Sequence, residues 1–138
     1  MSTFKSKYEE NLKSGTLLIQ KEFYNASVHC FYYACIQLML HILYYVEKID
    51  KNELNKNQKE TSNEIASGFH GWIINKFATL LIPKNTQAAM EFYQWIGELK
   101  NIRVKADYKE FKVETKIAGQ VKERAFYIIE TLKNNFDV

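Results

Sequence analysis

The chain has 138 residues, a length that fits one domain and leaves no room for a second. Hydrophobic residues make up 46% of it and charged residues 25%, which excludes a disordered tract and a fibrous repeat. Five glycines and one proline supply too little tight-turn chemistry for a β-sandwich or a barrel. The composition therefore predicts a single helical domain over residues 1–138, and its net charge of +3 specifies no partner.

A first helix is predicted over residues 3–20, where apolar side chains recur at helical spacing. Ser2 or Thr3 is available to cap its start, because a short hydroxyl side chain accepts a hydrogen bond from a free N–H of the first turn. Gly15 weakens this helix.

A second, longer helix is predicted over residues 22–49, which contain neither glycine nor proline. Its apolar surface extends beyond one stripe, so we expect a central helix covered by neighbouring helices or by a second copy of the chain. Residues 30–46 contain only Gln37 and His41 as clearly polar side chains. This run is shorter than the roughly twenty apolar residues of a membrane span, and we expect no insertion into a membrane.

The remaining chain is predicted to hold a long polar connection and three more helices. The connection covers residues 50–68, whose composition favours an exposed loop. The helices are expected at residues 69–82, 86–107 and 113–136. Pro83 ends the first of them, and Asn85 or Thr86 caps the next. The fold class expected is all-α, a mostly antiparallel, up-and-down bundle of five helices.

The cysteines and histidines show no metal-binding or redox pattern. Cys30 and Cys35 lie five residues apart, which is neither a Cys-x-x-Cys pair nor a zinc-ligand spacing, so we interpret them as buried thiols. His29 and His41 are interpreted as core or interface residues, and His70 as a cap or packing residue. We expect no bound metal and no cofactor.

Signatures of common enzymes and of export are missing from the sequence. There is no glycine-rich phosphate loop after a strand and no Gly-x-Ser-x-Gly elbow. The N-terminus lacks a basic and then apolar signal pattern with a small-residue cleavage site, so we expect a cytoplasmic protein.

Positive charge is concentrated in one short stretch near the end of the predicted fourth helix. Five cations face only two acids there, a local surplus equal to that of the whole chain: Lys100, Arg103, Lys105, Lys109 and Lys112 against Asp107 and Glu110. Such a patch suits a phosphate group or an acidic partner. The alternative is a solvated helix end, in which Arg103 and Asp107 pair across one turn.

Three segments together resemble one family. Residues 24–35, Tyr-Asn-Ala-Ser-Val-His-Cys-Phe-Tyr-Tyr-Ala-Cys, are similar to the opening of the second helix of HEPN domains (higher eukaryotes and prokaryotes nucleotide-binding). His-Gly-Trp-Ile-Ile-Asn at residues 70–75 is similar to the start of that family's third helix. Residues 103–108, Arg-Val-Lys-Ala-Asp-Tyr, resemble its R-x-x-A-D-Y motif at the end of helix four. The resemblance covers nearly the whole chain and implies a homodimer.

In the ribonuclease branch of HEPN domains, an R-x(4–6)-H motif from each protomer meets the RNA backbone in a shared cleft. Arg103 matches the arginine, whose planar fork suits phosphate. The positions where the histidine would fall hold Tyr108, Lys109 and Glu110, so the general acid/base of the motif is missing. Val104 also stands where active members often have a polar residue. The departures favour a non-catalytic member.

The leading hypothesis is an HEPN-like module that binds RNA or a nucleotide in an open basic groove. The ligand-binding residues expected are Arg103, Lys100, Lys105, Asp107, Tyr108 and His70. One alternative is a partner protein for a minimal nucleotidyltransferase in a toxin–antitoxin-like pair, as the resemblance implies. The other is residual, metal-independent ribonuclease activity that uses Arg103 with Tyr108 or His70.

Overall fold

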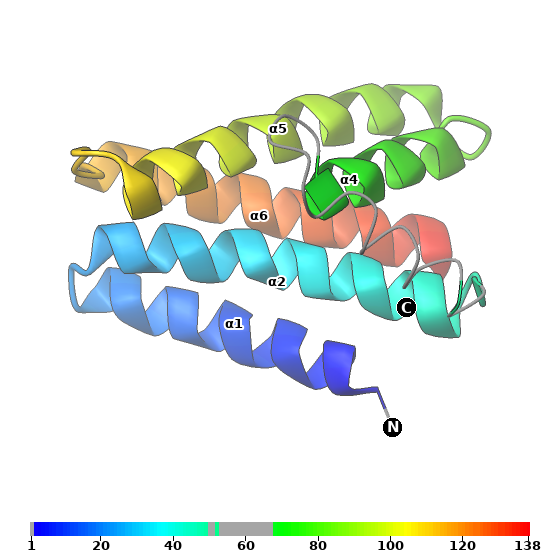
Figure 1. Cartoon of the computed structure of the whole chain (residues 1–138), viewed down its shortest axis with the longest axis horizontal. Helices are drawn as coiled ribbons and strands as arrows, with labels where there is room; N and C mark the ends of the chain where they lie inside the picture. The colour runs from blue at the N-terminus through cyan, green and yellow to red at the C-terminus, as the bar shows by residue number, and fades with distance from the viewer. Residues whose placement is uncertain (1, 50–51, 53–67) are drawn as a thin grey trace.

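The computed structural model describes residues 2–49, 52 and 68–138, and the described residues form helices and no strand. The helices are α1 (Thr3–Gln20), α2 (Tyr24–Tyr45), α4 (Gly68–Leu81), α5 (Thr86–Tyr108) and α6 (Thr115–Phe136). The predicted all-α fold is confirmed, whereas the predicted loop at 50–68 lies almost wholly outside the described residues. Figure 1 shows the chain reversing its direction between α1 and α2 and again between α5 and α6.

Helix α1 begins and ends at the residues predicted for it. The Ser2 hydroxyl caps it by accepting a hydrogen bond from the Lys5 N–H at 3.2 Å. Gly15 has a packing role that the sequence did not reveal, because a Cβ atom there would lie 2.9 Å from Cε1 of the fully buried Phe31. The missing side chain therefore lets α1 lie close against α2.

Helix α2 is the centre of the bundle and contacts each of the other four helices in the described part of the chain. Its largest fully buried side chains are Tyr32, Phe31, Ile36, Met39, Ile42 and Leu43. By length and composition α2 could also cross a membrane, but 67% of its most apolar window is buried inside the bundle, as in a core helix. The helix ends at Tyr45 rather than at Ile49. The backbone leaves the helical conformation there, and Lys48 has a left-handed φ of 52°.

The later helices begin and end at local signals. The Asn85 side chain caps α5 by accepting from the Ala88 N–H at 3.1 Å, and Pro83 follows the end of α4 by two residues. Helix α6 begins at Thr115, two residues later than predicted, because Val113 packs into the core and bonds to a side chain of another helix. Its side chain is buried, and its N–H donates to the Asn25 side chain at 2.9 Å.

Asn25 joins the first turn of α2 to the connection between α5 and α6. Its side-chain amide donates to the backbone oxygens of Ala106 at 3.2 Å and Phe111 at 2.8 Å, while its Oδ1 accepts from Val113. Three hydrogen bonds from one side chain satisfy backbone groups that no helix pairs. This contact fixes where the C-terminal turn of α5 lies relative to α2.

Both cysteines are free thiols. Cys35 is buried, as predicted, and burial raises the pKa of its thiol to about 12. Cys30 is only partly buried, and burial raises its pKa as well. Because the thiolate is the reactive form, neither residue is suited to redox chemistry at neutral pH.

Candidate functional site

The cluster around Arg103 forms where the C-terminal half of α5 crosses α2 and the start of α4. Arg103 is only 8% exposed, and its guanidinium carbon lies over the rings of three tyrosines. It is 5.1 Å from the ring centre of Tyr32, 5.5 Å from that of Tyr33 and 5.9 Å from that of Tyr108. These are cation–π distances, and the attraction is strongest where water is excluded.

Asp107 links Arg103 to a histidine on another helix. One oxygen, Oδ2, lies 3.5 Å from the Arg103 guanidinium, one helical turn away, and 3.0 Å from Nδ1 of His29 on α2. The side chain of His29 is 49% exposed. Because the carboxylate holds Nδ1, the second ring nitrogen, Nε2, remains for another partner. His29 is therefore not a core residue, and its predicted place at an interface stays a prediction.

His70 lies on the buried side of the same cluster. Its Nδ1 is 3.0 Å from the Tyr32 hydroxyl, and its ring also packs edge-on against Tyr33. Burial lowers the pKa of His70 to about 4, with help from the positive charges of Arg103 and Lys100. Near pH 7 this imidazole is neutral, so it adds no positive charge to the site.

The guanidinium of Arg103 keeps its charge although it is buried. Burial is the largest single influence and opposes the charge, but Tyr33, Tyr32 and Asp107 together raise the pKa of Arg103. Its Nε is buried and has no hydrogen-bond partner among the described residues. Nearby Lys100 has a lowered pKa, because it is partly buried and lies close to Arg103. The cluster thus holds two neighbouring cations and one carboxylate.

The structure brings together most, but not all, of the predicted site residues. Arg103, Asp107, Tyr108 and His70 meet, and Lys100 lies near them. Lys105 does not join them, because its ammonium group lies 5.8 Å from the ring centre of Phe111 instead. The expectation of an open groove is also wrong at Arg103 itself, whose side chain is covered by aromatic rings.

Sequence reasoning missed His29, Tyr32 and Tyr33 as members of the site. The spacing held a usable signal, because His29 and Tyr33 are four residues apart and therefore share a face of α2. Their rings lie 4.6 Å apart between centres. Nothing local, however, shows that this face meets Asp107, which is 78 residues away in the chain.

The described residues contain no group of three or more His, Cys, Asp or Glu side chains placed to hold a metal ion. No family model matches the chain, and no curated protein or solved structure matches it either. The HEPN resemblance consequently depends on the quoted motifs alone, and the homodimer and the nucleotidyltransferase partner stay predictions.

Proposed function

We propose that this chain binds RNA or a nucleotide through a phosphate group held at Arg103. The observation that carries the proposal is a buried guanidinium whose positive charge and hydrogen-bond donors are only partly satisfied by neighbouring groups. Among the described residues, its one carboxylate contact is at 3.5 Å and shares an oxygen with His29, and its Nε has no partner. Burying a guanidinium with an unpartnered donor is costly, and a phosphate oxygen could accept from Nε.

Access to Arg103 requires only a small rearrangement. Tyr108 is 73% exposed, and it is the last residue of α5. Rotation of an exposed side chain takes picoseconds to nanoseconds, so Tyr108 can turn away from the guanidinium without any change in the helices, while Tyr32 and Tyr33 stay on its other sides. Lys100, on the preceding turn of α5, adds a second positive charge for the approaching phosphate.

Fluorescence anisotropy with a short labelled RNA at low and moderate salt tests the proposal. We expect binding that weakens with salt, and a loss of about tenfold in Arg103→Lys, which keeps the charge but not the planar fork. Lys100→Gln should weaken binding and reduce its salt dependence. Lys7→Gln, an equal change of charge at an exposed position on α1, serves as the control. Circular dichroism shows whether each variant folds.

Two results would overturn the proposal. One is the absence of binding by the folded wild type at low salt. The other is equal weakening by Lys7→Gln and by the folded Arg103→Lys variant, which would indicate diffuse attraction to the surface rather than a site at Arg103.

Metal-independent cleavage of RNA is a second candidate, and the contact between His29 and Asp107 favours it. The segment that resembles the R-x(4–6)-H motif contains no histidine. Helix α2 supplies one, because Nδ1 of His29 lies 3.0 Å from the Asp107 carboxylate. In such a reaction a base takes the proton of the ribose 2′-hydroxyl, and the 2′-oxygen bonds to phosphorus. The bond from phosphorus to the 5′-oxygen then breaks, and that oxygen takes up a proton. The products are a 2′,3′-cyclic phosphate and a 5′-hydroxyl, and no metal or oxidant is consumed.

Two side chains would serve this reaction, His29 for both proton transfers and Arg103 for the charge on the phosphate. His29, oriented through Nδ1 by Asp107, has Nε2 free for proton transfer. Arg103 would stabilise the charge that develops on the phosphate oxygens. Incubation with RNA in the presence of a chelator tests this candidate, with His41→Gln as the matched control. We expect His29→Gln to abolish cleavage and leave RNA binding intact. Equal cleavage by His29→Gln, or none by the wild type, removes this candidate.

A further inference from the structure

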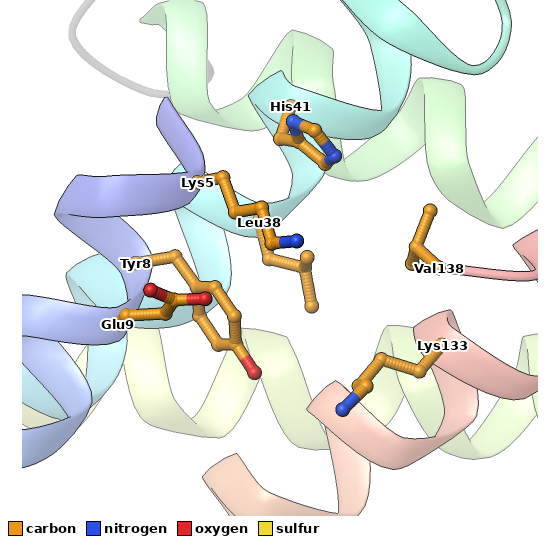
Figure 2. A pocket seen from close by; sticks show the side chains of 7 residues that line it. All are labelled: Lys5, Tyr8, Glu9, Leu38, His41, Lys133 and Val138. Atoms are coloured by element: carbon orange, nitrogen blue, oxygen red, sulfur yellow. The ribbon is translucent and has the colours of Figure 1, made fainter. Parts of the chain in front are cut away.

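A pocket lies between α1, α2 and the C-terminal part of α6, and it contains no residue of the Arg103 cluster. Its volume is about 390 Å³, within the range of small-molecule sites. Its lining consists of Lys5, Tyr8, Glu9, Leu38, His41, Lys133 and Val138. Figure 2 shows these side chains arranged around one space.

Two lysines from different helices line this pocket. They are Lys5 on α1 and Lys133 on α6 (Figure 2). Neither forms an ion pair with a described residue. Two unpaired cations on one concave surface raise the local potential and attract an anion.

A histidine adds a neutral donor to the same surface. The hydroxyl oxygen of Ser2 accepts from the Lys5 N–H, so its hydrogen is available for Nδ1 of His41, which lies 2.8 Å away. A neutral imidazole that accepts at Nδ1 carries its hydrogen on Nε2. Burial, aided by Lys5, lowers the pKa of His41, which favours the neutral imidazole near pH 7. Its N–H is the third donor.

The rest of the lining is mostly apolar. The ring of Tyr8 and the side chain of Leu38 are almost fully buried. Burial, with a smaller effect of Glu9, raises the pKa of Tyr8, so its hydroxyl stays protonated. Glu9 is the one acid in the lining and leaves a net positive charge with the two lysines.

We propose that this pocket binds a small phosphomonoester, with its phosphate on Lys5, His41 and Lys133 and its apolar part on Tyr8 and Leu38. A phosphomonoester carries about 1.5 to 2 negative charges at pH 7 and has three terminal oxygens. Two ammonium groups and one imidazole N–H match its three terminal oxygens in number, and the two ammonium groups carry the positive charge that faces it, although Glu9 reduces the net charge of the lining to +1. A carboxylate has one charge and two oxygens, and would leave one donor unused.

NMR titration of the full chain with phenyl phosphate tests the proposal, since ¹H–¹⁵N spectra report binding residue by residue. We expect saturable shifts at Lys5, Tyr8 and His41 that persist in the Arg103→Lys variant. Inorganic phosphate should bind more weakly, because it lacks the apolar part. Benzoate tests the carboxylate alternative, and benzyl alcohol tests apolar binding alone; both should bind at least about tenfold more weakly than phenyl phosphate.

Charge variants show whether the lining itself is responsible. Lys5→Gln and Lys133→Gln should each weaken phenyl phosphate by about tenfold, whereas Glu9→Gln should strengthen it. Lys7→Gln on α1 and Lys116→Gln on α6 are exposed controls with the same loss of charge.

Three outcomes overturn the proposal: no saturable shifts in the wild type, equal weakening by the control variants, or benzoate binding as tightly as phenyl phosphate. The RNA-binding proposal is tested separately, because Arg103→Lys should leave the affinity for phenyl phosphate unchanged.

Discussion

Stability between pH 7 and pH 4 should depend strongly on His70. The pKa of this residue falls from its usual 6.5 to about 4 in the folded chain, because the ring is buried beside Arg103 and Lys100. Between these two values the unfolded chain binds a proton that the folded chain does not. Stability from the neutral imidazole is therefore complete above pH 6.5 and is lost as the pH falls towards 4.

The size of the effect follows from the shift. Each unit of pKa difference corresponds to about 1.4 kcal/mol, so a group with this shift contributes up to about 3 kcal/mol. Because His70 is not fully buried, solvent screening reduces this amount, and we expect a loss of about 2 kcal/mol in the free energy of unfolding. Below pH 4 both states are protonated, and His70 causes no further loss.

Urea denaturation at several pH values between 4 and 8 measures this dependence. His70→Gln retains a polar side chain near the Tyr32 hydroxyl but cannot titrate, so its stability should fall about 2 kcal/mol less than that of the wild type. Asn75→Gln, at an exposed position on the same helix, is the control and should follow the wild type. Parallel pH profiles for the wild type and His70→Gln would refute the account of a buried, neutral imidazole.

Three further substitutions test the packing that positions the site. Asn25→Ala removes one hydrogen bond to the last turn of α5 and two to the segment after it, and should lower the free energy of unfolding by about 2–4 kcal/mol in urea denaturation; a change below 1 kcal/mol would contradict this role. Gly15→Ala places a methyl group against Phe31 and should cost about 1–2 kcal/mol despite its better helix propensity, with an unchanged or raised melting temperature as the contrary result. Asn85→Ala removes the α5 cap and should cost about 1 kcal/mol, whereas Asn85→Asp should retain most of it.

Much of the fold was predictable because its signals are local. Helix α1 has the predicted bounds, and the caps at Ser2 and Asn85 are confirmed by their hydrogen bonds. Apolar periodicity also identified α2 as the central helix, since a helix that is apolar on several faces has to be covered. The predicted start of α6 at Val113 was wrong, because the N–H of Val113 donates a hydrogen bond to the side chain of Asn25, which is distant in the chain.

The site was only half predictable. The R-x-x-A-D-Y segment located Arg103, Asp107 and Tyr108 on one helix end, since residues one turn apart lie on the same face. Neither the burial of Arg103 nor its contact with Tyr32 follows from that spacing. Both depend on which face of α2 meets α5.

The amino-acid sequence by itself determined the helices, their caps and the positively charged segment, because periodicity, capping and charge act over a few residues. Only the tertiary structure decided that His29 meets Asp107, that Lys105 lies apart, and that Lys5 and Lys133 share a pocket. These contacts join residues far apart in the chain. They depend on how the helices rotate and cross when they bury their apolar faces, and a one-dimensional pattern does not contain that rotation.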